Sequence, residues 1–199
     1  MKCQLVHLCQ IGTMAFMAET NSDERRTAIL DAALGKFAAY GFARTSMADI
    51  AEAAGMSRPA LYQHFGNKEE IFRAMLEVIL EGAADKAISA LDAESGLEVQ
   101  LDGFLQRWTG DLAEQMRSTE HGGDLVEAKT GYAKPVYDAV NTRIRKALRD
   151  HLTASAVADV AGAVDLVLLA PIGFKYDDPS TAKFRRRLSA LAESVAARA

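Results

Sequence analysis

The fold of this chain is decided by residues 45–72, which read TSMADIAEAAGMSRPALYQHFGNKEEIF. Ser46 and Asp49 stand at the spacing of a capping box, in which each residue bonds the other at the start of a helix. Met47, Ile50, Ala51 and Ala54 recur at i, i+3, i+4 and i+7 and predict one buried face. Gly55 ends that helix, because glycine adopts the left-handed conformation at no steric cost.

A second short helix and the start of a longer one follow in the same stretch. Ser57 can cap the second helix, and Pro59 falls in its first turn, where a missing N–H does no harm. Leu61 is expected to point inward, and Asn67 with Glu70 to cap the longer helix. Two short helices joined by a tight turn with glycine form a helix-turn-helix, whose second helix fits the DNA major groove. Taken alone, this hairpin also suits any small helical bundle.

The wider run over residues 29–72 resembles the TetR (tetracycline-repressor) family of transcription regulators. The matching elements, in the family's order and spacing, are 29–33 (ILDAA), Phe37, 40–42 (YGF), 45–47 (TSM), 49–51 (DIA), 54–57 (AGMS), 61–65 (LYQHF) and 67–72 (NKEEIF). The resemblance implies an all-α protein, with an N-terminal three-helix helix-turn-helix domain. A fourth helix would join that domain to a C-terminal helical domain for effector binding and dimerisation.

The resemblance also implies which residues meet DNA. Arg58 can fork onto the O6 and N7 of a guanine, and Gln63 can pair with an adenine. Tyr62, His64 and Lys68 match positions at which members of the family contact DNA phosphates. The expected DNA-binding set is Arg44, Thr45, Ser46, Ser57, Arg58, Pro59, Ala60, Tyr62, Gln63, His64 and Lys68. Many members carry Gly-Thr where this chain has Pro59 and Ala60, so the operator sequence does not follow from the resemblance.

Composition supports an all-α chain with a sizeable core. Of 199 residues, 49% are hydrophobic, alanine is abundant and only four are proline. The net charge is −4, and acidic residues outnumber basic ones between residues 19 and 80. DNA affinity would therefore depend on a few locally placed cations, and we expect it to fall steeply with salt.

Three segments are expected along the chain. These are a disordered N-terminal tail over 1–20, the helix-turn-helix domain over 21–67, and the effector-binding and dimerisation domain over 68–199. An alternative for the tail is a start codon placed too early, with Met14 or Met17 as the native first residue. A helix is predicted over 22–40, closed by Gly41, with Phe42 folded back on Phe37. No run of 18 apolar residues exists, so no membrane span is expected.

Further helices are predicted over 68–91, 97–117, 125–129, from Pro135 to about residue 152, over 157–176 with a kink at Pro171, and from Ser180 onward. Gly82 is expected to mark close packing or a bend in the helix over 68–91. The basic residues of the helix that starts at Pro135 are expected to be solvated. The last two helices suit a two-fold homodimer interface, with intrachain core as the alternative.

Effector binding is expected in the second domain, for a hydrophobic or aromatic small molecule. The candidate residues are Phe104, Trp108, Leu112, Met116, Tyr132, Tyr137 and Phe174. Plain core packing is the alternative for each. Glu120, His121 and Asp124 form the one polar cluster with metal-like residues, but their spacing is ordinary for a loop, so no metal or other cofactor is expected.

The chain shows no phosphate-binding glycine loop and no nucleophile elbow, so an enzyme is not expected. The expected function is a cytoplasmic, ligand-responsive regulator, most often a repressor in the resembled family. It would bind a short palindromic operator as a dimer and leave it when a small molecule binds. The alternative is a helical small-molecule sensor or interaction protein without DNA-binding function.

Overall fold

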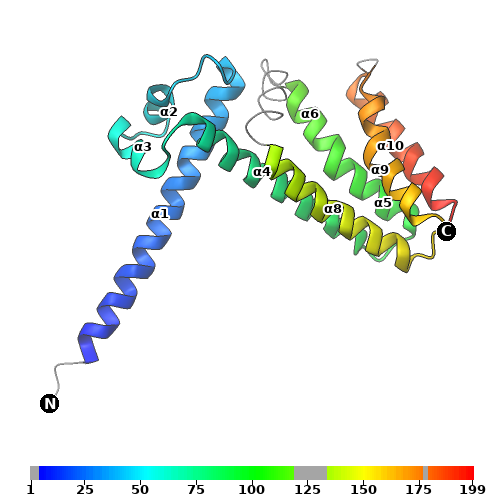
Figure 1. The fold of residues 1–199 in the computed structure, drawn as a ribbon, viewed down its shortest axis with the longest axis horizontal. Coiled ribbons are helices and arrows are strands. Elements are labelled where there is room, and N and C mark those ends of the chain that lie inside the picture. Colours follow the sequence, from blue (N-terminus) through cyan, green and yellow to red (C-terminus); the bar gives the residue numbers. More distant parts are fainter. Residues whose placement is uncertain (1–4, 119–133, 177–178) are drawn as a thin grey trace. The chain divides into compact units, whose positions relative to one another are not determined.

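The computed structural model describes residues 5–118, 134–176 and 179–199, of which 5–21 and 115–118 are described as backbone only. Within these ranges every regular element is a helix, which confirms the all-α prediction (Figure 1). In chain order they are α1 (Leu5–Tyr40), α2 (Met47–Ala53), α3 (Arg58–His64), α4 (Lys68–Leu91), α5 (Leu97–Leu105), the π-helix η1 (Gln106–Gly110), α6 (Asp111–Ser118), α8 (Lys134–Ala154), α9 (Val160–Phe174) and α10 (Thr181–Ala196).

The chain divides into two compact units, Met1–Met75 and Leu76–Ala199, so α4 begins in the first and ends in the second. The domain limits expected from the sequence, at residues 20 and 67, stay predictions. No helix in the described part of the chain combines the length and the apolar character needed to cross a bilayer.

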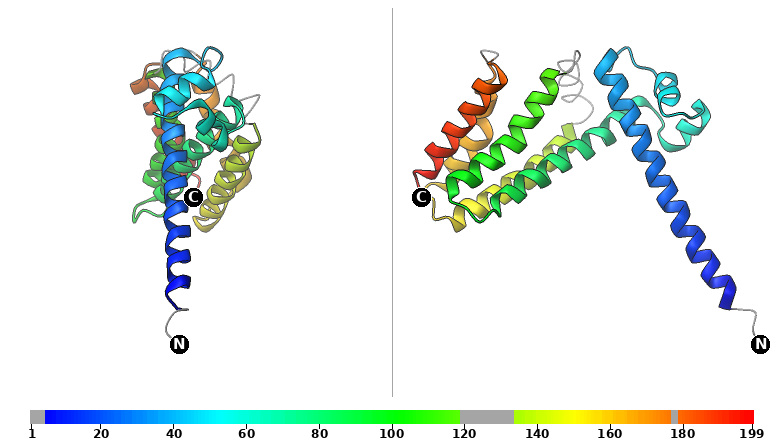
Figure 2. Two further views of the ribbon diagram at one scale, coloured as in Figure 1. Left: turned by 90° about the vertical axis from the view of Figure 1, so that its left-hand side faces the viewer. Right: turned by 180° about the vertical axis from the view of Figure 1, so that it is seen from behind.

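Helix α1 starts much earlier than the sequence pattern predicts. It begins at Leu5 rather than near Ser22, and it is drawn as one unbroken helix in Figure 2. Residues 5–21 contain no proline and include two each of the good helix formers Leu, Met and Ala, so the backbone can continue through the cap expected at Asn21. The other end lies where predicted, because Gly41 has φ +79° and its N–H donates to the Phe37 carbonyl at 2.9 Å.

Three aromatic rings form the centre of the first unit. The ring centroids of Phe37 and Phe42 lie 5.3 Å apart, as the predicted helix-end contact requires, and the Phe72 ring lies 5.7 Å and 5.0 Å from them. Such tilted and edge-on pairs add to the hydrophobic gain of burial. Ile50 of α2 and Leu61 of α3 are fully buried in the same unit. The core therefore holds both short helices by their inward faces.

The second unit is a helical bundle in which α10 packs against α5, η1 and α9, and α8 packs against α9. Both ribbon figures show α8 running alongside the later part of α4. The inward faces predicted for two of its helices are confirmed by burial. They are Val140, Ile144, Leu148 and Leu152 of α8, and Phe184, Leu188, Leu191 and Val195 of α10.

Several predictions for the second unit need correction. The helix expected over 97–117 is interrupted by η1, a π-helical turn that the apolar spacing does not signal. The helix expected from residue 157 begins at Val160, because the Asp159 side chain accepts the Gly162 N–H at 2.9 Å and caps it there. Pro171 lies inside α9. The short helix expected over 125–129 lies outside the described residues.

Two expectations for surface residues are also revised. A Cβ built on Gly82 meets nothing within 4 Å, so close packing does not explain this glycine, and a bend stays a prediction. Arg143 of α8 is paired with Glu81 and Asp85 of α4 rather than simply solvated. Sequence spacing within one helix does not reveal such pairs, since the carboxylates come from another helix.

Candidate nucleic-acid interface

The start of α2 is fixed by the predicted capping box. The Asp49 N–H donates to Ser46 Oγ at 3.3 Å, and the Ser46 N–H donates to Asp49 Oδ2 at 2.8 Å. The Ser46 hydroxyl, and after it the Ser46 backbone N–H, lowers the pKa of Asp49, because donors stabilise the charged carboxylate. The cap therefore holds α2 most firmly while Asp49 is ionised.

The turn between α2 and α3 is a Schellman motif. The Met56 N–H donates to the Ala51 carbonyl at 3.0 Å, and the Gly55 N–H donates to the Glu52 carbonyl at 3.1 Å. Gly55 takes the left-handed conformation, with φ +66°, as predicted. Ser57 then caps α3, since its Oγ accepts the Ala60 N–H at 3.3 Å. The direction of α3 thus follows from bonds between residues close in sequence.

The outward face of α3 carries most of the expected DNA-contacting side chains. Leu61 and, just beyond the helix, Phe65 are buried, which turns the opposite face to solvent. On that face Arg58, Pro59, Tyr62 and Gln63 are exposed, whereas Ala60 and His64 are half-buried.

Arg58 and Tyr62 are joined on this exposed face. Arg58 Nη2 donates to Tyr62 Oη at 3.3 Å, and the guanidinium carbon lies 5.6 Å from the centroid of the Tyr62 ring. The contact combines a hydrogen bond with a cation–π interaction, and it holds the guanidinium beside the ring. Arg26 of α1 lies over the ring of Phe65 in a similar way, with 4.6 Å to the centroid.

The loop over residues 41–46 holds the remaining expected DNA contacts, and it places them differently. Ser46 and Arg44 are exposed, with Arg44 Nε donating to the Tyr40 carbonyl at 3.0 Å. Thr45 was expected on the surface but is 3% exposed, because its hydroxyl turns inward to the backbone. Lys68 is half-buried, and its ammonium group donates to backbone carbonyls of this loop.

The expected effector-binding side chains that the structure describes lie against one core cluster of the second unit. Phe104 is fully buried and Trp108 is 9% exposed, whereas Leu112, Tyr137 and Phe174 are partly buried at the edge of that cluster. The Met116 side chain and Tyr132 lie outside the described residues, as do Glu120, His121 and Asp124.

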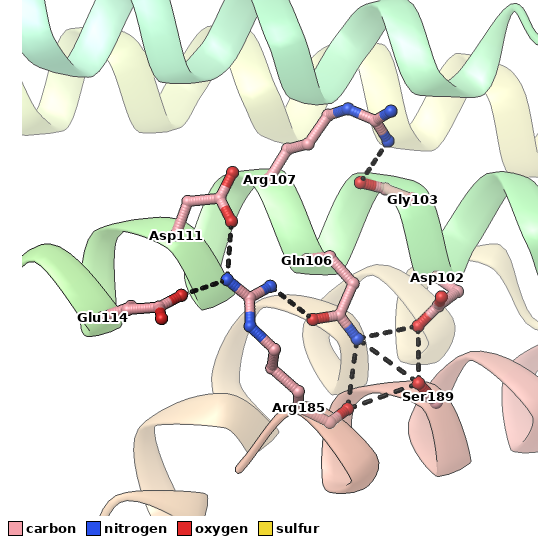
Figure 3. Close-up of polar contacts among 8 residues, drawn as sticks. All are labelled: Asp102, Gly103, Gln106, Arg107, Asp111, Glu114, Arg185 and Ser189. Atoms are coloured by element: carbon pink, nitrogen blue, oxygen red, sulfur yellow. Dashed lines mark hydrogen bonds and ion pairs between the residues drawn. The ribbon is translucent and has the colours of Figure 1, made fainter. Parts of the chain in front are cut away.

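A polar network around Arg185 of α10 was not foreseen from the sequence (Figure 3). Arg185 Nη2 donates to Asp111 Oδ1 at 2.9 Å and to Glu114 Oε2 at 2.6 Å, and Nη1 donates to Gln106 Oε1 at 3.0 Å. Gln106 Nε2 in turn donates to the Arg185 carbonyl at 3.1 Å. The network ties η1 and α6 to α10, and it therefore fixes the segment that carries Trp108.

The first unit is similar in sequence to known regulatory proteins. The family model for bacterial regulatory proteins of the tetR family matches residues 29–75. The probable HTH-type transcriptional regulator ArpR of Pseudomonas putida is 39% identical over 85 residues, which are 43% of this chain and 40% of ArpR. The HTH-type transcriptional regulator TtgR, also of Pseudomonas putida, is 43% identical over 68 residues, or 34% of this chain and 32% of TtgR. The matches thus span less than half of each relative.

Similarity of fold extends much further along the chain. A transcriptional regulator of the TetR/AcrR family from Thermobifida fusca superposes with a TM-score of 0.67. The superposition covers 85% of this chain and 96% of that protein, at 18% sequence identity. At that identity the likeness shows a shared fold.

Proposed function

Residues 29–75 belong to the tetR family of bacterial regulatory proteins, and on this premise we propose that the chain is a ligand-responsive transcriptional repressor rather than an enzyme. It would bind a short palindromic operator in double-stranded DNA as a homodimer. A small molecule bound by the second unit would release it. This role places the protein in the cytoplasm.

The observation that carries the proposal is the exposed face of α3. A seven-residue helix is capped at its start by Ser57 and buried through Leu61, yet it presents Arg58, Tyr62 and Gln63 to solvent. Arginine and glutamine are the side chains that read guanine and adenine in the major groove. We propose Arg58 and Gln63 as base contacts, with Pro59 and Ala60 against a thymine methyl group.

The remaining proposed contacts position the protein on the DNA backbone. Tyr62, His64 and Arg44 are proposed to contact phosphates, together with Ser46 and Ser57 at the starts of α2 and α3. Phosphate contacts set orientation and carry no sequence information of their own. Because the chain has a net charge of −4, these few groups must supply the electrostatic attraction, and affinity should fall steeply with salt.

The first experiment is selection of bound fragments from a random duplex DNA library, at low and at physiological salt. Recovery of a palindrome with half-sites about one helical turn apart, roughly 34–36 Å, would support a dimeric regulator. No enrichment at either salt would favour a sensor without DNA-binding function. A small molecule that already holds the protein in the released state would also prevent enrichment. Mass spectrometry of the extracted protein tests for such a molecule.

We propose that α9 and α10 form the homodimer interface. Support comes from the outward side of α9, where Leu169 is 53% and Ile172 is 64% exposed. Leu169→Glu together with Ile172→Glu should convert the dimer into monomers in sedimentation experiments, while far-UV circular dichroism stays unchanged. Val99→Glu on α5, also at an exposed position, is the matched control.

We propose a hydrophobic or aromatic effector bound near Phe104, Trp108, Leu112, Met116, Tyr132, Tyr137 and Phe174. Among the described members, Trp108 is the best reporter, since it is the one tryptophan of the chain. Compounds that change its fluorescence and also release the selected operator would support the assignment. An effector acts only through different affinities for the two states, so a compound that binds without changing DNA affinity is not the effector.

A further inference from the structure

Lys68 is the first residue of α4, and its side chain reaches back to the loop over residues 41–46 between α1 and α2. Its Nζ donates to the carbonyl oxygens of Phe42 at 2.9 Å, Ala43 at 3.2 Å and Thr45 at 3.1 Å. A lysine ammonium group has three N–H donors and no acceptor, so each donor has its own carbonyl partner. The same Nζ lies 4.6 Å from the centroid of the Phe42 ring, which adds a cation–π contact.

The loop is fixed from within by a second side chain. Thr45 Oγ1 donates to the Gly41 carbonyl at 2.8 Å, and the Thr45 side chain is 3% exposed. Thr45 and Lys68 together therefore satisfy loop carbonyls that have no helical partner. The loop leads directly into Ser46, the cap of α2, so its conformation decides where α2 begins.

We propose that Lys68 serves DNA binding as a positioning residue, whose ammonium group fixes the loop between α1 and α2, rather than as a phosphate contact. A phosphate contact would require the ammonium group to give up carbonyl partners that already match its donors. The inference rests on the proposed DNA-binding function. It replaces the phosphate role that the family resemblance implies for Lys68, and it gives Thr45 the same positioning role.

The first test uses the free protein. Lys68→Met keeps the apolar stem and removes the ammonium group. Amide hydrogen exchange is then followed at Gly41 and Ser46, whose N–H groups are bonded at the two ends of the loop, to Phe37 and Asp49. We expect exchange at both to become at least about tenfold faster, since the loop opens locally more often. Unchanged exchange would overturn the proposal, and this result holds whether or not the chain binds DNA.

The second test measures affinity for the selected operator and for random duplex DNA across salt concentrations. Loss of one phosphate contact lowers the magnitude of the log–log salt slope by about 0.9. Lys68→Met should weaken both kinds of DNA alike and leave the slope unchanged. Arg44→Met, a change to an exposed cation of the same loop, is the comparison and should lower the slope by about 0.9. A slope reduced by Lys68→Met, with exchange unchanged, would contradict the positioning role.

The variant Lys68→Arg keeps the positive charge of the side chain but changes the arrangement of its donors. It also provides a test if Lys68→Met fails to fold. Arginine keeps the charge and binds phosphates well, but its planar fork does not match three carbonyls that converge on one point. We expect Lys68→Arg to lose DNA affinity about tenfold and to show the faster exchange at Gly41 and Ser46. Full affinity with normal exchange in this variant would overturn the proposal.

Discussion

The two units of the chain use their polar side chains in different ways. In the first unit, Lys68, Thr45 and Arg44 bond to backbone carbonyls of one loop and one helix end. In the second unit, Arg185 and Arg143 join side chains that belong to other helices.

This difference shows that the units are specified over different ranges of sequence. The caps and turns of the first unit depend mainly on residues three to five apart, and the matching family model lies within that unit. The ion pairs and hydrogen bonds between helices of the second unit join residues far apart in the chain. Both partners can therefore change together while the helices still pack. A similar fold at 18% identity is the expected result.

The largest expected effect breaks the first unit alone. Phe72 is fully buried against the rings of Phe37 and Phe42, so Phe72→Ala should cost about 3–5 kcal/mol of that unit's stability. Denaturant unfolding followed by circular dichroism measures the loss, and Trp108 fluorescence reports the second unit separately. Val78→Ala, at a 62% exposed position of the same helix, should change stability by less than about 0.5 kcal/mol. Equal shifts of both signals in Phe72→Ala would mean that the units unfold as one.

The next effect concerns DNA recognition, which we assign to the first unit and not to the second. Arg58→Ala should reduce discrimination between operator and random DNA by about 1–3 kcal/mol, because a bidentate guanine contact is lost. Competition binding at fixed salt measures the ratio. Arg107→Ala, at an exposed arginine of the second unit, should leave that ratio unchanged. Equal losses in both variants would remove the special role of α3.

Two helix ends of the same type, one in each unit, allow a further comparison of the units. Both α2 and α8 end in Schellman motifs, with Gly55 at φ +66° in one and Ala156 at φ +57° in the other. Gly55→Ala should cost about 1–2 kcal/mol, because a Cβ disfavours the left-handed conformation. Ala156→Gly should instead stabilise by up to about 1 kcal/mol, since the strain that it removes outweighs the unfolded-state entropy that it adds. Thermal unfolding of the two variants should therefore shift in opposite directions.

The smallest expected effect is a pH dependence of the second unit. Burial lowers the pKa of His151, an effect that the charge of Asp92 partly opposes. The unfolded chain then binds the proton more readily, so stability should fall as pH drops from about 6.5 towards the lowered pKa. His151→Gln should flatten this part of the stability curve. An unchanged curve in that variant would assign the pH dependence to other groups.

Local patterns predicted much of the first unit because their physics is local. Ser46, Gly55 and Ser57 lie at a cap, a left-handed turn and a second cap, and the structure confirms each one. The same reasoning missed η1, because Phe104, Trp108 and Leu112 keep the spacing of an ordinary α-helix across it. It also missed the start of α1 at Leu5, because the helix continues through the cap expected at Asn21.

The candidate DNA-binding face could be predicted for the same reason, since helical spacing decides which side chains of α3 oppose Leu61. The sequence by itself determined the all-α class, the helix-turn-helix and the exposure of Arg58. Tertiary structure alone decided that Lys68 and Thr45 turn to the backbone of the loop over residues 41–46, and that Arg185 joins α10 to η1 and α6. Those choices depend on carbonyls and carboxylates brought close by packing, and sequence spacing within a single helix carries no record of that proximity.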